Sequence, residues 1–221
     1  MNKKTEPELT FKEKIILYLN SHWKAASILL GVLVLAMAGI LILDLSGRKK
    51  EEASAMAAED IQKAFDEWKK AEPEDRADEE LNTLINRALS DYPHNFAAQR
   101  ALFTRGLMAL EKDEWNGASA SFNELAEKWP KSYLAPVSLA NAAGAFEQAG
   151  NMEQALASWQ KLADNYSGTS ANVPEALFNI ARLNEKAGDN DAALEGYKNL
   201  ESLFPSSRWT DLAKTRILIL K

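Results

Sequence analysis

Very few side chains in this sequence have the types and spacing that catalysis or metal binding requires. The 221 residues include no cysteine, which excludes disulfides, zinc ribbons, iron–sulfur clusters and thiol catalysis. The two histidines, His22 and His94, are far apart in the chain, with no cysteine or third histidine to complete a metal site. We therefore expect no metal ion and no cofactor.

The carboxylates do not suggest an acid/base pair. A run of them falls between predicted helices: Glu72, Glu74, Asp75, Asp78, Glu79 and Glu80. We interpret this run as solvated charge. The sequence also lacks a phosphate-binding loop, a G-x-S-x-G nucleophile turn, an H-E-x-x-H zinc motif and a dinucleotide-type glycine fingerprint. A hydrolase would need a nucleophile and a base that are missing here, so we expect that the protein is not an enzyme.

The charge distribution separates the first 50 residues from the rest. Residues 1–50 carry eight Lys or Arg and four Asp or Glu, whereas residues 51–221 carry 18 and 28. An acidic body is a poor match for nucleic acid, whose binding depends on Lys and Arg at phosphates. Alanine and leucine dominate the apolar content, which favours helix. We therefore expect an all-α protein that does not bind nucleic acid.

Residues 25–43 contain no charged side chain, which predicts a transmembrane helix over 25–45. At about 1.5 Å per residue this run nearly crosses the roughly 30 Å hydrocarbon layer of a membrane. A cleaved signal peptide is the alternative, because Ala53-Ser54-Ala55 resembles a cleavage tripeptide. The apolar run is, however, longer than a signal peptide needs. A linker over 46–55 would connect the span to the body.

Residues 1–24 predict an amphipathic leader before the span. Thr10 and Glu13 have the spacing of a capping box, which starts a helix. Four large apolar residues then recur at every fourth position and would form one stripe: Phe11, Ile15, Leu19 and Trp23. We expect this helix to lie on the membrane surface.

Basic residues on the two sides of the span do not decide its orientation. Five lysines precede it (Lys3, Lys4, Lys12, Lys14 and Lys24) and four basic residues follow it closely (Arg48, Lys49, Lys50 and Lys63). A signal-anchor with a short leader commonly translocates the domain that follows, largely regardless of that domain's charge. We therefore expect a cytoplasmic N-terminus and a body on the other side of the membrane.

The body repeats itself with a period of 37 to 38 residues. The turn at 113–118 aligns with the turns at 150–155 and 188–193. The same offsets align three apolar columns: Phe122, Trp159 and Tyr197; Leu125, Leu162 and Leu200; Trp129, Tyr166 and Phe204. A column of small residues holds Gly106, Ala143 and Ala181, and a weaker copy starts near 57–68. Since small residues are needed where two helices cross closely, each copy predicts one antiparallel helix pair.

Cap residues mark the ends of these helices. Gly150 and Gly188 suit left-handed C-caps. Asn151, Asp189 and Asn172 suit N-caps of the helices that follow them.

This pattern resembles the tetratricopeptide repeat (TPR), whose signature of Leu, Gly or Ala, Ala, an aromatic residue and Pro spans a helix–turn–helix. The matching residues are Leu102, Gly106, Ala118, Phe122, Leu125 and Pro130; Leu139, Ala143, Ala155, Trp159, Leu162 and Ser167; and Leu177, Ala181, Ala193, Tyr197, Leu200 and Pro205. The second copy lacks the proline. The resemblance implies an α-solenoid over 56–221, with three to four helix pairs and a C-terminal capping helix.

The order of leader, span and repeat body is similar to that of the family of ancillary subunits of the SecYEG translocon. The junctions at 129–132 and 204–207, which read aromatic-Pro-x-Ser, look like those of TPR proteins in the bacterial cell envelope. This resemblance implies a single-pass protein of the bacterial inner membrane with its C-terminal domain in the periplasm. Its partners would be translocon subunits, chaperones or emerging envelope proteins.

The first helices of TPR pairs line a concave face, which implies a set of partner-binding positions. These are Arg100, Phe103, Thr104 and Leu107; Val137, Ala140, Asn141 and Gly144; and Glu175, Phe178, Asn179 and Arg182. Apolar residues mixed with Asn and Arg would suit an extended peptide or a helix. Phe103, Leu107 and Phe178 could instead pack against neighbouring helices. TPR proteins that grip a terminal carboxylate have a lysine where this chain has Phe103, Ala140 or Phe178, so we expect apolar cargo.

The last predicted helix ends in four apolar residues: Ile217, Leu218, Ile219 and Leu220. Four adjacent residues spread over more than one face of a helix. They either pack back onto the third copy, or part of the set contacts a partner or a second copy of the chain.

Together these features predict a membrane-tethered scaffold for protein–protein interactions. The alternative is an oligomeric structural or assembly factor of the cell envelope, serving cell-wall, division or outer-membrane assembly. It would assemble through the apolar residues at 217–220.

Overall fold

The computed structural model describes residues 10–76 and 78–220. Across these residues the chain is helical and has no strand, so the expected all-α class is confirmed. The helices are α1 (Phe11–Ser21), α2 (Trp23–Lys70), α3 (Asp78–Asp91), α4 (Phe96–Glu111), α5 (Trp115–Lys128), α6 (Leu134–Gln148), α7 (Met152–Asn165), α8 (Val173–Lys186), α9 (Asn190–Leu203) and α10 (Arg208–Leu220). One turn of 3-10 helix, Pro73–Asp75, lies between α2 and α3.

The chain divides into two compact units, Met1–Glu52 and Ala53–Lys221. In the first unit the expected capping box starts α1. The Thr10 hydroxyl accepts a hydrogen bond from the Glu13 backbone N–H at 3.4 Å, and the Glu13 carboxylate accepts one from the Thr10 N–H at 2.8 Å. The large residues Phe11, Ile15 and Trp23 are exposed. Residues 1–9, with Lys3 and Lys4, and the side chain of Leu19 lie outside the described residues.

Helix α2 contains the expected span and is long and apolar enough to cross a membrane. None of the residues in its most apolar window is buried in the structure. The helix continues without a break through 46–55, so the segment that we expect to link span and body is itself helical.

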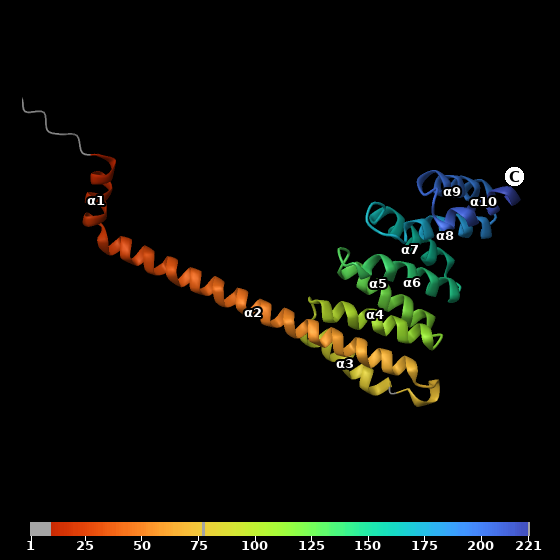
Figure 1. Ribbon diagram of the computed structural model, residues 1–221, viewed down its shortest axis with the longest axis horizontal. Helices are drawn as coiled ribbons and strands as arrows, with labels where there is room; N and C mark the ends of the chain where they lie inside the picture. The colour runs from red at the N-terminus through yellow and green to blue at the C-terminus, as the bar shows by residue number, and fades with distance from the viewer. Residues whose placement is uncertain (1–9, 77, 221) are drawn as a thin grey trace, which may run out of the picture. The chain divides into compact units, whose positions relative to one another are not determined.

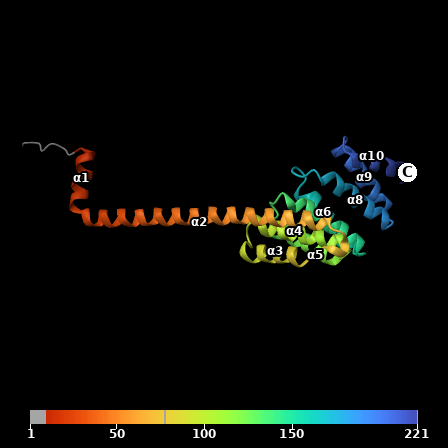
Figure 2. The same cartoon turned by 60° about the horizontal axis from the view of Figure 1, so that its bottom comes forward.

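The second unit is a stack of antiparallel helix pairs (Figures 1 and 2). The end of α2 pairs with α3 around buried Ile61, Phe65, Leu81 and Ile85. The pairs α4–α5, α6–α7 and α8–α9 follow, and α10 packs on α8 and α9. This arrangement is the solenoid with a final packed helix that the repeat predicts.

The turns inside three of the pairs share one backbone geometry. Asp113, Gly150 and Gly188 have φ angles of 58°, 81° and 86°. In each turn the next backbone N–H donates to a carbonyl five residues earlier, at 2.8, 2.8 and 3.0 Å. The left-handed C-caps expected at the two glycines are therefore confirmed. Asp113 adopts the same conformation with a β-carbon, which the left-handed region disfavours.

Only part of the N-cap expectation holds. The Asp189 carboxylate accepts a hydrogen bond from the Ala192 N–H at 3.0 Å, as an N-cap does. Within the described residues, the side chains of Asn151 and Asn172 make no such bond, so those two expectations are wrong. Asn172 has helical rather than extended dihedrals, and its amide donates to the Glu175 carboxylate at 3.3 Å instead.

Paired helices approach closely at the column of small residues. A β-carbon built on Gly106 would lie 2.7 Å from two ring atoms of Phe122, which is fully buried. Ala143 and Ala181 are also fully buried. On the facing helix, a β-carbon on Gly196 would lie 2.9 Å from the β-carbon of Ala181. The contact therefore needs small residues on both sides in the third copy, which the first-helix column alone does not reveal.

A polar contact joins the second clear helix pair to the third. The Glu147 carboxylate, near the end of α6, accepts a hydrogen bond from Trp159 Nε1 of α7 at 3.2 Å. It also binds Arg182 Nη2 of α8, with both carboxylate oxygens at 2.7 Å. One carboxylate on a first helix thus holds its own second helix and the next first helix.

The same arrangement recurs one repeat later at Glu185. Its carboxylate accepts hydrogen bonds from the Tyr197 hydroxyl of α9 at 3.0 Å and from Arg216 Nε of α10 at 3.1 Å. The hydrogen bond from Arg216 lowers the pKa of Glu185 below its usual value, and the bond from Tyr197 acts in the same direction, although burial opposes both. Glu185 therefore stays ionised at neutral pH and neutralises Arg216.

Asp78 makes a related contact in the first pair, where we expect solvated charge. Its carboxylate accepts a hydrogen bond from Trp68 Nε1 at 2.7 Å and forms an ion pair with Lys112. The Arg76 guanidinium lies over the Trp68 ring, 4.1 Å from its centroid. Asp78 is therefore bonded within the protein while its side chain stays 42% exposed, because the short turn after α2 brings the start of α3 back onto Trp68.

The close approach at Gly106 predicts that a single methyl group destabilises the fold. We expect Gly106→Ala to lower the free energy of unfolding by about 1–3 kcal/mol, because the added carbon displaces the buried Phe122 ring. Gly144→Ala is the matched control, because it also lies in a first helix and nothing lies within 4 Å of the added carbon. It should be neutral or stabilising by up to about 1 kcal/mol, since alanine favours helix. Urea unfolding followed by circular dichroism measures both, and equal midpoints would contradict the close contact.

The Glu185 contact predicts a loss of stability in acid. Its pKa is lower in the folded chain than the usual value of 4.5. The stabilisation is therefore fully present above pH 4.5 and disappears as the pH falls through the lowered pKa. Glu185→Gln should reduce the acid-induced fall of the urea midpoint, measured between pH 7 and pH 3. The control is Glu195→Gln, which removes an exposed carboxylate from α9 and should leave the pH dependence of the urea midpoint as in the parent. If the urea midpoints of Glu185→Gln and the parent fall equally between pH 7 and pH 3, the Glu185 contact has no part in the acid sensitivity.

Candidate functional site

The expected partner-binding residues lie on the first helices of three successive pairs, α4, α6 and α8. Nine of them are partly exposed: Arg100, Phe103, Leu107, Val137, Ala140, Asn141, Gly144, Glu175 and Arg182. The other three, Thr104, Phe178 and Asn179, are buried.

The buried positions correct the expected surface. Thr104 is only 1% exposed, and it follows buried Ala101 by three residues and precedes buried Met108 by four. That side of α4 therefore faces neighbouring helices. Phe178 packs against the rings of Tyr197 and Trp209, with centroids 5.5 and 5.3 Å away. Packing is thus the role of Phe178, and neither residue offers its side chain to a partner in this conformation.

Arg100 is held in place by three side chains. Its Nη1 donates to Gln62 Oε1 of α2 at 2.9 Å, and its Nη2 donates to the Tyr133 hydroxyl at 3.4 Å. The guanidinium also lies 5.5 Å from the centroid of the Phe96 ring. Arg100 therefore connects three successive helix pairs, in addition to whatever it contributes to binding.

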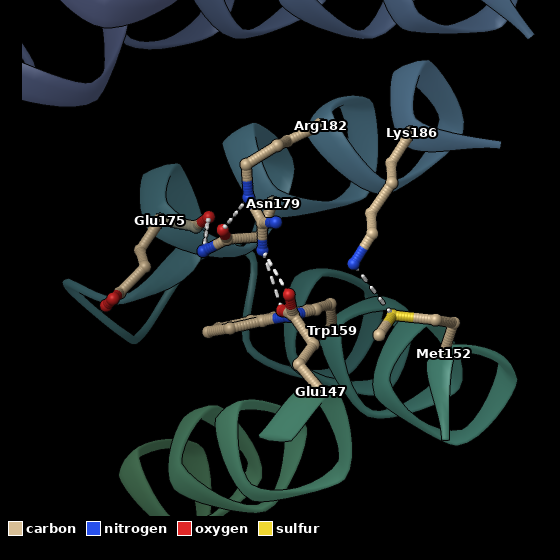
Figure 3. A network of polar contacts seen from close by, with 7 residues as sticks. All are labelled: Glu147, Met152, Trp159, Glu175, Asn179, Arg182 and Lys186. Atoms are coloured by element: carbon tan, nitrogen blue, oxygen red, sulfur yellow. Dashed lines mark hydrogen bonds and ion pairs between the residues drawn. The ribbon is translucent and has the colours of Figure 1, made fainter. Parts of the chain in front are cut away.

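Asn179 and Arg182 are likewise bonded to each other and to the stack (Figure 3). Asn179 donates to the Glu175 backbone carbonyl at 3.0 Å, and its Oδ1 accepts from Arg182 Nε at 2.9 Å. Arg182 then reaches Glu147 of the preceding pair. Most hydrogen-bonding capacity of these predicted site residues is used within the protein.

The remaining residues form a mainly apolar surface on α4 and α6, which we call the interaction face: Phe103, Leu107, Val137, Asn141 and Gly144. Three of them, Phe103, Leu107 and Val137, pack against the same buried cluster and are only partly covered. Phe103 lies edge-on to Phe122, 5.5 Å between ring centroids. Nothing lies within 4 Å of a β-carbon built on Gly144, so the backbone on this face is open to a close approach there.

The described residues offer no group of three or more His, Asp or Glu side chains that could hold a metal ion.

The four apolar residues near the end of α10 divide between the two expected roles. Ile217 is 6% exposed and belongs to a core cluster with Tyr197 and Leu200, and Leu220 packs against that cluster. Leu218 and Ile219 are 75% and 62% exposed. The helix thus anchors itself with two residues and presents the other two to solvent.

Glu147 and Glu185, which hold successive pairs together, do not stand out in the sequence. They are 38 positions apart, as are Trp159 and Tyr197, so the repeat period contains the signal for them. Their cationic partners lie in the helix that follows each pair, α8 for Glu147 and α10 for Glu185, which a comparison of columns within single copies does not reveal.

Comparison with known proteins agrees with the observed helix pairs. The tetratricopeptide repeat family model matches residues 140–169 and 175–207. A TPR repeat-containing protein of Treponema pallidum is 30% identical over 138 residues, which are 62% of this chain and 57% of that protein. The chain therefore spans little more than half the length of this relative.

A solved structure shows the same fold. The crystal structure of a tetratricopeptide repeat protein from Parabacteroides merdae superposes with a TM-score of 0.56 at 17% identity. The superposition covers 75% of this chain and 60% of that one. The helix pairs and their small-residue contacts agree with these matches, and the family model identifies tetratricopeptide repeats at residues 140–169 and 175–207.

Proposed function

We propose that the chain is a membrane-tethered scaffold that binds other proteins on its interaction face. Tetratricopeptide repeats form protein–protein interaction scaffolds, because stacked helix pairs present an extended surface. The observation that carries the proposal is the partly exposed apolar set Leu107, Val137 and Gly144, beside side chains whose polar groups are already bonded within the stack. Such a surface recognises apolar side chains of a peptide or helix rather than a charged terminus.

Tethering would make weak binding sufficient. Helix α2 has the length and composition of a membrane span, and confinement near one membrane raises the effective concentration of partners that reside there. Our proposal places the body in the periplasm of a bacterium, ancillary to translocon subunits and chaperones at the inner membrane. The resemblance to the ancillary translocon subunits supports this location.

The alternative function, an oligomeric assembly factor of the cell envelope, is favoured by one observation. Leu218 and Ile219 are largely exposed on α10, and large exposed apolar residues that lie together often mark a contact between proteins. In that case the partner of α10 would be a second copy of the chain.

The tether predicts a membrane-embedded chain with a protected N-terminus. In a bacterial host, the full-length chain should stay in the membrane pellet after alkaline carbonate extraction. Protease added to spheroplasts should degrade the body while a tag placed before Thr10 survives. If the body resists protease until the membrane is lysed, our orientation is wrong. If the mature chain lacks the first 50 or so residues and is released in carbonate, residues 25–43 act as a cleaved signal peptide.

The interaction face predicts position-specific crosslinking. A photoreactive amino acid at Val137 or Asn141 should capture other proteins in living cells, because these positions are partly exposed on the face. Gln160, exposed on second helix α7, is the control and should capture little. Equal capture from all three positions would contradict a face on α4 and α6. Capture of only a second copy of the chain, strongest from Leu218, would favour the oligomeric alternative.

A further inference from the structure

A separate pocket lies at the far end of the stack, where α8, α9 and α10 meet. It has a volume of about 390 Å³ and is lined by Phe178, Arg182, Glu185, Lys186, Tyr197 and Arg216. Phe178 and Tyr197 are 8% and 0% exposed, with ring centroids 5.5 Å apart. These two rings are buried beneath the pocket, and the other four lining residues are charged.

The charged residues in this pocket are not balanced. Three are cations and one is an anion, although the body from residue 51 onward has 18 basic and 28 acidic residues. Glu185 neutralises Arg216, and Arg182 is paired with Glu147 outside the pocket lining. Of the three cations in the pocket lining, Lys186 is the one that neither of these ion pairs neutralises.

Lys186 has no carboxylate partner among the described residues. Its ammonium group lies 3.7 Å from the sulfur of Met152, as Figure 3 shows. A thioether is a weak acceptor and carries no charge, so it does not neutralise the ammonium. One positive charge therefore remains uncompensated at the mouth of the pocket.

The two arginines also retain donors. Arg182 uses Nε and Nη2 for Asn179 and Glu147. Arg216 uses Nε and Nη2 for Glu185. In both guanidinium groups the Nη1 nitrogen has no hydrogen-bond partner among the described residues, and a carboxylate is the group that guanidinium and ammonium donors bind most strongly.

We propose that this pocket binds an acidic side chain, Asp or Glu, of a partner protein. The carboxylate contacts the Lys186 ammonium and the free guanidinium nitrogens of Arg182 and Arg216. This inference rests on the proposed interaction function and adds the chemistry of one partner segment. It concerns a different surface from the interaction face on α4 and α6.

The test uses the full-length chain and fluorescein-labelled, C-terminally amidated peptides. The probe is Gly-Ser-Glu-Phe-Asp-Gly-Ser, compared with a version in which both acids are lysine. Fluorescence anisotropy at about 0.15 M salt should show saturable binding of the acidic peptide and much weaker binding of the lysine peptide. Equal binding of the acidic and the lysine peptides, or no binding up to about 1 mM, would overturn the proposal.

Variants separate the pocket from general electrostatics. Lys186→Glu should weaken binding of the acidic peptide roughly tenfold or more, since it replaces a charged donor with a repelling carboxylate. Lys186→Arg should retain most of it. Lys198→Glu makes the same charge change at an exposed site on α9 outside the pocket, and it should leave the affinity unchanged. An equal loss in Lys186→Glu and Lys198→Glu would show that the pocket is not the site.

Two further measurements keep the outcomes distinct. Circular dichroism and urea midpoints must match the parent in each variant, so that a loss of binding is not a loss of folding. Crosslinking from Val137 and Asn141 should persist in Lys186→Glu. If that crosslinking succeeds while the acidic peptide fails to bind, the pocket inference is wrong and the proposed scaffold function stands.

Discussion

The close contact between the two helices of each pair is the constraint on which the rest of the stack depends. At Gly106 there is no room for even one more carbon beside Phe122, and at Ala181 the facing residue must be Gly196. Burial of an aromatic side chain such as Phe122 contributes about 1.5–3 kcal/mol. A methyl group at the crossing would cost a similar amount, so the small residues decide whether the aromatic ring can occupy its site at all.

Contacts between successive pairs obey a different rule. Glu147 and Glu185 each connect a second-helix aromatic residue to an arginine of the helix that follows the pair. The Arg182 side chain is 36% exposed and the Glu147 side chain 15%, so solvent screens the pair and its net contribution is modest, about 1 kcal/mol or less. Its main effect is geometric, because the planar guanidinium binds both carboxylate oxygens and fixes how one pair is placed on the next.

These two rules explain which parts of the fold the sequence could predict. The helix pairs, the small-residue contacts and the glycine caps depend on residues one repeat apart or less, and each leaves a column in the sequence. The exposure of Thr104 and Phe178 leaves no such column, because it depends on which side chains the neighbouring helices cover. Both belong to first helices, yet Met108 and Ala101 mark a packed side of α4, and Trp209 of α10 covers Phe178.

Two local contacts are not visible in the sequence for a related reason. Asp78 stands in a run of carboxylates, and Trp68, ten residues earlier, uses it as the acceptor for its indole N–H. Asn172 has the residue type of a cap, but its backbone is already helical, so its amide bonds to Glu175. In both cases the partner is set by the path of the chain between helices, which residue type alone does not specify.

The acidic character of the body limits how a negatively charged partner segment could be held. Over most of the surface the net charge repels such a segment, and this repulsion acts at long range and is weakened by salt. At Lys186 an uncompensated ammonium and two partly used guanidinium groups surround one small volume, so attraction there is short-range and directional. Long-range repulsion mainly lowers the rate at which acidic segments arrive. An acidic body with one local positive pocket would therefore discriminate by position: it would hold an acidic side chain that reaches this pocket and repel acidic segments elsewhere on its surface.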